Sequence, residues 1–204
     1  KEFIERYLAG CRKIVVGFDY TFGCGGSGSA ALLGASLPGK VEIVPEMDYY
    51  RLKVGSRRIR TLLEQGKIHT ANHLLGRPYK IKGTIQRGHG RGKELGFPTA
   101  NVDYGNYLLP HSGVYATRTH IRDEVFTSLT NIGNNPTFGN RSVTLESHLF
   151  GFDDDSYGEL ASIEFLEYIR PEIRFTKPED LKKQILHDEL RLEEIIRRKG
   201  LITK

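Results

Sequence analysis

The second half of the chain consists of short segments in which apolar and polar residues alternate, and this pattern restricts the fold most. Such segments follow residue 77, separated by residues typical of turns, at 79–86, 113–121, 125–132, 143–150 and 161–169. A period of two predicts strands with one buried face. Several short strands at this spacing favour an antiparallel β-barrel. A helix over 178–199 is expected to follow, because Pro178 suits a first helical turn and Gly200 suits a stop.

The first 76 residues have a different pattern. Short apolar runs at 13–18 and 41–44 predict buried strands of the parallel type, and 54–64 and 68–75 predict helices. This mixture indicates an α/β piece with a parallel sheet, although two strands are too few for a stable doubly wound sheet. We therefore expect a domain boundary near residue 77, between residues 1–76 and residues 77–204.

Charge and cysteine content restrict the class of protein. The formal net charge is +5, which fits a phosphate-bearing ligand and equally a generic basic surface. No apolar run approaches the roughly 18 residues that a bilayer span needs, and the chain does not open with a signal-peptide pattern. Cys11 and Cys24 have no metal-ligand spacing to a histidine pair. The expectation is a cytoplasmic protein with reduced thiols and no membrane partner.

Residues 83–101 combine features of a phosphate site and a metal site. Gly88, Gly90 and Gly92 alternate along the loop, so backbone N–H groups are free to turn toward an anion, and Arg91 and Lys93 add positive charge. Pro98-Thr99-Ala100-Asn101 follows. In an extended segment Thr99 and Asn101 share a face, where their oxygens suit a hard cation. Nucleotide phosphate with Mg²⁺ is the expected ligand, although Asn101 could instead cap a turn.

The run from Gly88 to Asn101 closely resembles riboflavin kinase. Further motifs of that family occur in the family's order, and they are Asn131-Ile132-Gly133, Pro136-Thr137-Phe138, the run from Thr144 to Leu149, Phe152-Asp153, Tyr157-Gly158, and Arg170-Pro171-Glu172 with Phe175. The resemblance covers residues 76–196. It implies a six-stranded antiparallel β-barrel with a C-terminal helix, and transfer of the γ-phosphoryl group of ATP to the 5′-hydroxyl of riboflavin, giving FMN and ADP with Mg²⁺ as cofactor.

The resemblance also implies a role for individual residues. Glu146 would be the general base, and Thr99 and Asn101 would hold Mg²⁺. The residues expected at the ATP phosphates are Gly88, Gly90, Arg91, Gly92, Lys93, Gly96 and Thr99. Those expected at the flavin are Phe97, Asn131, Arg170, Glu172 and Phe175, with Thr137 as a further polar neighbour.

Simpler interpretations exist for several of these residues. On pattern alone Glu146 is a solvated carboxylate on a strand face, and His148 on the same face is a surface or packing histidine. Phe175 could be a core residue. Asp153-Asp154-Asp155 lacks the spacing of a calcium loop, so a solvated hairpin tip is preferred.

The N-terminal piece, residues 1–76, resembles the C-terminal part of the FMN adenylyltransferase module of the bacterial bifunctional enzyme, with a nucleotidyltransferase-like parallel sheet. The resemblance implies adenylyltransferase activity only in a full-length form. Residues 16–23 and 56–60 carry the resemblance, in which Asp19, Ser56 and Arg60 match positions that serve adenylyl transfer. The His-x-Gly-His loop of that module is absent, and around Ser56 the family usually has Ser-Ser-Thr whereas this chain has Gly55-Ser56-Arg57. We therefore expect no FAD synthesis by these residues, an expectation that conversion of FMN and ATP to FAD by residues 1–204 would contradict.

Two other classes of function stay open on the sequence. A non-catalytic flavin- or nucleotide-binding regulator is one alternative, which Thr99, Asn101 and Glu146 argue against. A nucleic-acid binder is the weaker one, because Arg57-Arg58 and Arg197-Arg198 are placed as ordinary charges near helix ends. No nucleic-acid partner is therefore expected, and the sequence does not indicate an oligomeric state.

Overall fold

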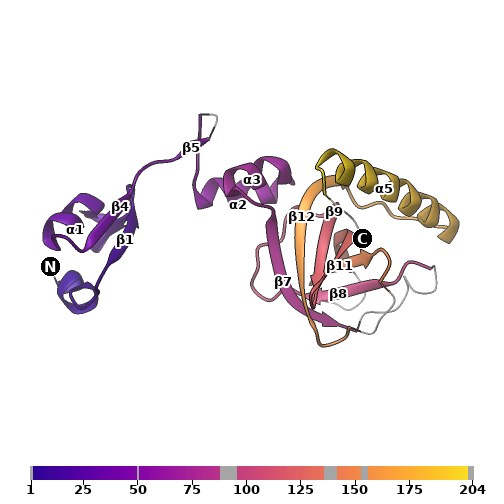
Figure 1. The fold of residues 1–204 in the computed structure, drawn as a ribbon, viewed down its shortest axis with the longest axis horizontal. Coiled ribbons are helices and arrows are strands. Elements are labelled where there is room, and N and C mark those ends of the chain that lie inside the picture. Colours follow the sequence, from indigo (N-terminus) through magenta and orange to yellow (C-terminus); the bar gives the residue numbers. More distant parts are fainter. Residues whose placement is uncertain (1, 50, 88–95, 136–141, 153–155, 202–204) are drawn as a thin grey trace. The chain divides into compact units, whose positions relative to one another are not determined.

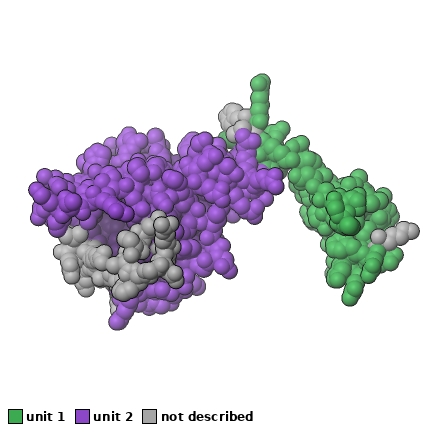
Figure 2. All heavy atoms as spheres, turned by 180° about the vertical axis from the view of Figure 1, so that it is seen from behind, with its two compact units in different colours: residues 1–54 green, residues 55–204 purple. Residues whose placement is uncertain are grey.

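The structure is a computed structural model that describes residues 2–49, 51–87, 96–135, 142–152 and 156–201. It divides into two compact units, Lys1–Val54 and Gly55–Lys204, which Figure 2 colours separately. The first is a small α/β unit. The second, in its described residues, is a β-barrel with three helices.

The first unit is built on a parallel strand pair. β1 (Ile14–Gly17) pairs with β4 (Val41–Val44), and α1 (Ala30–Ser36) lies between them in sequence. The side chain of Ser29 caps α1 by accepting a hydrogen bond from the backbone of Leu32, at 3.2 Å. The remaining elements are short: the π-helix η1 (Ile4–Leu8), the 3₁₀ turn η2 (Cys24–Gly26), and the antiparallel pairs β2 (Thr21–Phe22) with β3 (Gly28–Ser29) and β5 (Asp48–Tyr49) with β6 (Leu52–Lys53). The expected parallel α/β piece is confirmed.

Two helices precede the barrel and pack against it. They are α2 (Ser56–Glu64) and α3 (Ile68–Leu75), which contribute Leu63, Ile68 and Ala71 to the buried core of the barrel. Asn72 fixes α3 further, because its amide nitrogen donates to the carbonyl of Phe165 at 2.8 Å and its oxygen accepts from the backbone of Tyr79 at 2.7 Å. The compact units therefore divide before α2, whereas the change of sequence pattern places a boundary near residue 77. The assignment of residues 1–76 to an adenylyltransferase-like module stays a prediction.

The second unit contains a closed barrel of six strands (Figure 1). The strands are β7 (Tyr79–Gln86), β8 (Thr99–Asp103), β9 (Gly113–Ile121), β10 (Glu124–Asn135), β11 (Ser142–Leu149) and β12 (Leu160–Arg170). Their order around the barrel is β10-β11-β8-β7-β12-β9, and every neighbouring pair is antiparallel. This architecture confirms the expected barrel. The alternating segments predict five of its strands, and the short β8 is the sixth.

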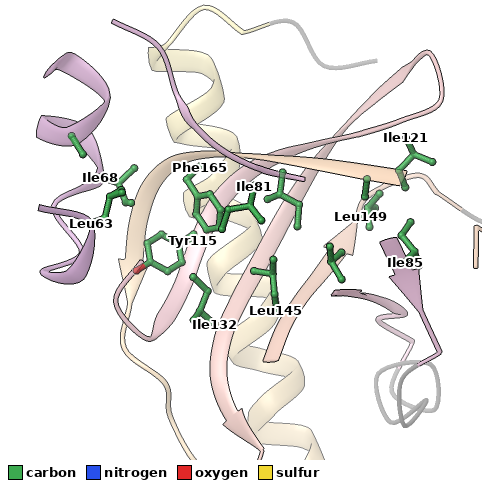
Figure 3. Close-up of a cluster of buried hydrophobic side chains, with 14 residues drawn as sticks. Leu63, Ile68, Ile81, Ile85, Tyr115, Ile121, Ile132, Leu145, Leu149 and Phe165 are labelled. Carbon is green, nitrogen blue, oxygen red and sulfur yellow. The ribbon is translucent and has the colours of Figure 1, made fainter. Parts of the chain in front are cut away.

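The barrel interior is filled by large apolar side chains and a group of hydroxyls. Tyr115 and Phe165 are fully buried and meet edge to face, with 5.2 Å between ring centroids (Figure 3). The hydroxyls belong to Thr117, Thr119, Ser128, Thr130 and Ser147, all of them fully buried and hydrogen-bonded to one another. Buried polar groups cost stability unless they are paired, and these are paired.

The C-terminal helix covers part of the outer surface of the barrel (Figure 1). α5 (Pro178–Arg198) begins with Pro178 and has acidic residues in its first turn and basic residues in its last, as expected from the sequence. Its inner face supplies Leu192, Ile195 and Ile196 to a second cluster, which also contains the outward-facing Val114, Ala116, Leu129 and Leu166 of the barrel. Within the described residues, no helix has the length and apolar character needed to cross a membrane.

A buried glutamate holds three basic side chains together on the outside of the barrel. Glu164 is 7% exposed, and its carboxylate lies 2.8 Å from Lys80, 2.6 Å from Arg118 and 3.2 Å from His120. Burial alone would raise the pKa of Glu164, but the interactions with these three neighbours outweigh burial and bring the pKa to about 2.

We expect this carboxylate to make the fold sensitive to acid. The pKa of Glu164 is lower in the folded state than its ordinary value of 4.5, so its contribution is complete above pH 4.5 and is lost as the pH falls toward 2. The difference between the ordinary pKa and the folded-state pKa of Glu164 corresponds to about 3 kcal/mol of unfolding free energy. In urea denaturation between pH 2.5 and 6, the unfolding free energy should fall more steeply with decreasing pH for wild type than for Glu164→Gln. Equal pH dependence in the two proteins would contradict this.

Candidate functional site

A pocket of about 300 Å³ lies between the outer face of the barrel and α5. Strands β8 to β12, the segment after β12 and the helix all contribute to its wall. The lining residues are Phe97, Thr99, Val114, Leu129, Asn131, Glu146, His148, Arg170, Glu172, Ile173, Phe175, Leu181, Ile185 and Asp188. The wall thus combines apolar and aromatic side chains with a few polar groups, which is typical of a small-molecule site.

Strand register explains why distant residues meet in this pocket. Glu146 on β11 lies opposite Asn131 on β10 and opposite Asn101 on β8. In the next row on the same face, His148 lies opposite Thr99. Residues directly opposite each other in antiparallel strands share a face, as do residues two positions apart along one strand. These side chains therefore gather on the outer face of the sheet.

The pocket brings together most of the site residues expected from the sequence that the structure describes. The expected residues that line it are Phe97, Thr99, Asn131, Glu146, Arg170, Glu172 and Phe175. Asn101 is not part of its wall, although it shares a row with Glu146. Gly96 directly precedes Phe97 and has a φ of 85°, a left-handed conformation that favours glycine. The roles of all these residues stay predictions.

Several expected residues lie outside the described part of the chain. They are Gly88, Gly90, Arg91, Gly92 and Lys93 of the glycine-rich loop, Thr137, and the run Asp153-Asp154-Asp155. Their proposed roles therefore rest on the sequence alone.

His148 is a pocket residue that the sequence pattern favours as a surface or packing histidine. Its Nδ1 lies 2.7 Å from the carbonyl oxygen of Pro98, so this nitrogen carries the proton and donates it. The ring also meets Phe97 edge to face, with 5.5 Å between centroids. The sequence feature that could have indicated a pocket position for His148 is its spacing of two residues from Glu146, which puts both side chains on one face of the strand. The pair of contacts ties β11 to the segment that leads into Thr99.

Asp188 is a second pocket residue that sequence reasoning missed. It is 1% exposed on α5, and Arg170 Nε donates to both of its carboxylate oxygens, at 3.0 and 2.9 Å. The other contacts of the pair are Arg170 Nη2 to Asp188 at 2.8 Å, Arg170 Nη1 to the carbonyl of Pro171 at 3.0 Å, and Gln184 Nε2 to Asp188 at 2.9 Å. A helical aspartate gives no local signal that it faces an arginine 18 positions earlier.

Gly133 makes room for a polar group of the pocket. A Cβ atom at this position would overlap the carboxylate of Glu172 and would come close to the amide nitrogen of Asn131. The bare backbone of β10 thus lets the segment after β12 approach closely. This is a physical reason for glycine in the Asn131-Ile132-Gly133 motif.

The three residues expected to serve adenylyl transfer fall in different units. Asp19 belongs to the first unit, where its carboxylate lies 3.4 Å from Lys53. Ser56 and Arg60 belong to the second unit, on the first turns of α2. A joint role for them stays a prediction.

Comparison with known proteins agrees with this geometry. The family model described as riboflavin kinase matches residues 75–196. The chain is 39% identical to the bifunctional riboflavin kinase/FMN adenylyltransferase of Bacillus subtilis, in a match that covers 92% of this chain and 62% of the relative. The protein of the same description from Escherichia coli K12 is 32% identical, with 89% and 59% covered.

A solved structure is similar as well. It is described as a macrolide-efflux protein from Streptococcus pneumoniae, and it matches with a TM-score of 0.83 at 32% identity, over 94% of this chain and 64% of that one. The chain spans about three fifths of the length of the curated relatives named above. Since the family model covers more than half of its residues and the fold and pocket agree with it, the chain belongs to the riboflavin kinase family.

Proposed function

We propose that this chain phosphorylates riboflavin, transferring the γ-phosphoryl group of ATP to the 5′-hydroxyl of the ribityl chain. The observation that supports this most is the meeting of Glu146, Thr99 and Asn131 on one face of the pocket, beside Phe97 and Phe175. The carboxylate of Glu146 can accept a hydrogen bond from a bound hydroxyl, and the hydroxyl of Thr99 and the amide of Asn131 can donate hydrogen bonds to a phosphate. Aromatic and aliphatic walls are what a flavin ring needs.

The walls of the pocket suit a flat apolar ligand. Phe97 and Phe175 stand on the segments that enter β8 and α5, and Leu129, Leu181 and Ile185 add aliphatic surface. Its volume of about 300 Å³ is at the lower end of the range for small-molecule sites, about 300–1,000 Å³. We infer that the isoalloxazine ring binds among these side chains, with the ribityl chain directed toward β11.

Glu146 is the residue best placed to receive the proton of the ribityl hydroxyl. It projects from β11 into the pocket, half-buried between the rows of β8 and β10. Phosphoryl transfer depends mostly on positioning and on charge stabilisation. A carboxylate within hydrogen-bond reach orients the hydroxyl for attack and accepts its proton as the new P–O bond forms.

The donor atoms on β8 fit a magnesium ion. Thr99 and Asn101 project from the same face of the strand and provide a hydroxyl and an amide oxygen, which are hard ligands. Mg²⁺ usually completes its coordination with water and substrate phosphates, and when bound it would neutralise charge on the polyphosphate. Thr99 and Asn101 would hold it, and Lys93 and Arg91 of the glycine-rich loop are proposed to bind the phosphates.

The contact between Gly133 and Glu172 leads to a prediction about affinity. In Gly133→Ala the new methyl group displaces the carboxylate of Glu172, an exposed and flexible side chain, so the unfolding free energy should change by no more than about 1 kcal/mol. The KM for riboflavin should rise about tenfold, because the wall of the pocket moves. Steady-state kinetics measure this. Gly55→Ala, where nothing lies within 4 Å of the new methyl group, is the matched control, and an unchanged KM in Gly133→Ala would contradict the prediction.

Incubation of the chain with riboflavin, ATP and Mg²⁺, followed by chromatographic detection of FMN, tests the proposed function. Formation of FMN supports it. Binding of riboflavin without FMN formation would favour a flavin-binding regulator instead.

A further inference from the structure

The segment between β12 and α5 forms one wall of the pocket. It comprises residues 171–177, named here the strap, and it brings Glu172, Ile173 and Phe175 to the site. Most of its side chains are exposed, so the strap has little core packing of its own. Besides the contact of Glu172 with Gly133, its position should therefore depend on contacts at its ends.

One end of the strap is clamped by the pair Arg170–Asp188. Arg170 is the last residue of β12, and Asp188 lies within α5, so the pair joins the strand before the strap to the helix after it. Arg170 Nη1 also donates to the carbonyl of Pro171, the first residue of the strap. All three guanidinium nitrogens are thus engaged by the protein, with side-chain exposures of 15% for Arg170 and 2% for Asp188.

Burial makes the two members of this pair depend on each other. A carboxylate as buried as Asp188 is costly unless it is paired and hydrogen-bonded, and Arg170 and Gln184 supply the hydrogen bonds. Removing either charged partner leaves the other buried without its counter-charge. Loss of Asp188 should therefore disturb the strap as much as loss of Arg170.

We infer that Arg170 and Asp188 are a positioning pair for the flavin site, in which Arg170 acts through the strap and does not bind the ligand directly. Asp188, on α5 beyond the strap in sequence, is then a determinant of riboflavin affinity through its ion pair with Arg170. This inference rests on the proposed function in so far as riboflavin is taken as the ligand of the pocket.

A double-mutant cycle tests the inference. The variants are Arg170→Met, Asp188→Asn and the two together, and the measured quantities are the dissociation constant of riboflavin and the kinetic constants. Each single variant is expected to weaken riboflavin binding about tenfold. The double variant should weaken it no further, because both substitutions break the same ion pair. The KM for MgATP should stay within about twofold in all three. If Arg170→Met weakens binding tenfold while Asp188→Asn leaves it unchanged, Arg170 is a direct ligand and the inference is wrong.

Two further variants separate positioning from general stability. Leu192→Ala removes a core contact of α5 and should lower the melting temperature while leaving riboflavin affinity within about twofold. Glu194→Gln breaks an exposed ion pair with Arg191 on the same helix and should change neither quantity. A loss of affinity in Leu192→Ala as large as that in Asp188→Asn would mean that the helix as a whole matters, not this pair.

Hydrogen exchange of the ligand-free protein separates this inference from the proposed function. Exchange at the backbone amides of the strap should rise at least about fivefold in both single variants, and equally in the double variant. If riboflavin does not bind to the wild-type protein, the proposed function is wrong. The exchange data would still test whether Arg170 and Asp188 hold the strap in place. Unchanged exchange of the strap in Asp188→Asn would overturn the inference.

Discussion

Replacement of Glu146 by glutamine is expected to lower the rate of riboflavin phosphorylation by about 10²–10⁴, the usual contribution of a general base. The substitution keeps the size and the hydrogen-bonding reach of the side chain, so the pocket and its neighbours Asn131 and Asn101 should keep their positions. Only the capacity to accept the proton is lost. The expected result is a fall in kcat with little change in the dissociation constant of riboflavin, measured by steady-state kinetics and by quenching of flavin fluorescence.

Glu124→Gln is the matched control for this experiment. Glu124 is an exposed glutamate at the start of β10, far along that strand from Asn131, and its replacement should leave kcat within about twofold. A kcat for Glu146→Gln within about threefold of wild type would show that Glu146 is not the base. Loss of riboflavin binding in the same variant would instead assign it to the binding of substrate.

The second large effect concerns the barrel itself. Phe165→Ala should lower the free energy of unfolding by about 3–5 kcal/mol, because it removes a large side chain from a closed interior and leaves a cavity. Phe165 is fully buried, meets Tyr115 edge to face and lies 6.2 Å from the ring centre of Tyr79. Urea denaturation measures the change.

Leu160→Ala on the same strand is the control for this second prediction. Leu160 is 73% exposed, so its truncation should cost no more than about 0.5 kcal/mol. A cost of less than about 1 kcal/mol for Phe165→Ala would mean that the interior closes around the gap, and that the barrel is less tightly packed than its contacts indicate.

Local sequence pattern was enough to predict most of the barrel. Alternation over 79–86 and 113–121 coincides with β7 and β9, because a strand with one face in the core must repeat every second residue. α5 was predicted from its ends, because Pro178 suits a first helical turn and Gly200 suits a stop. The short β8 and the seven-residue α1 were not predicted, since neither is long enough for a period to stand out.

The site depends on information that local pattern does not carry. Family resemblance, not periodicity, pointed to Glu146 and Asn131, and strand register then explains why they meet. Asp188 could not be found in this way, because its contact with Arg170 depends on how α5 lies against the barrel. The packing of α2 and α3 on the core was missed for the same reason: Leu63 and Ile68 look like the inner face of any amphipathic helix.

The fate of the γ-phosphoryl group of ATP decides whether this chain phosphorylates riboflavin. The purified chain is incubated with riboflavin, Mg²⁺ and ATP labelled in that group, and the flavins are separated. We expect labelled FMN and an equal amount of ADP, with FMN formation strongly reduced in Glu146→Gln and unaffected in Glu124→Gln. Riboflavin that binds to the wild-type chain but stays unlabelled at saturating MgATP would contradict it.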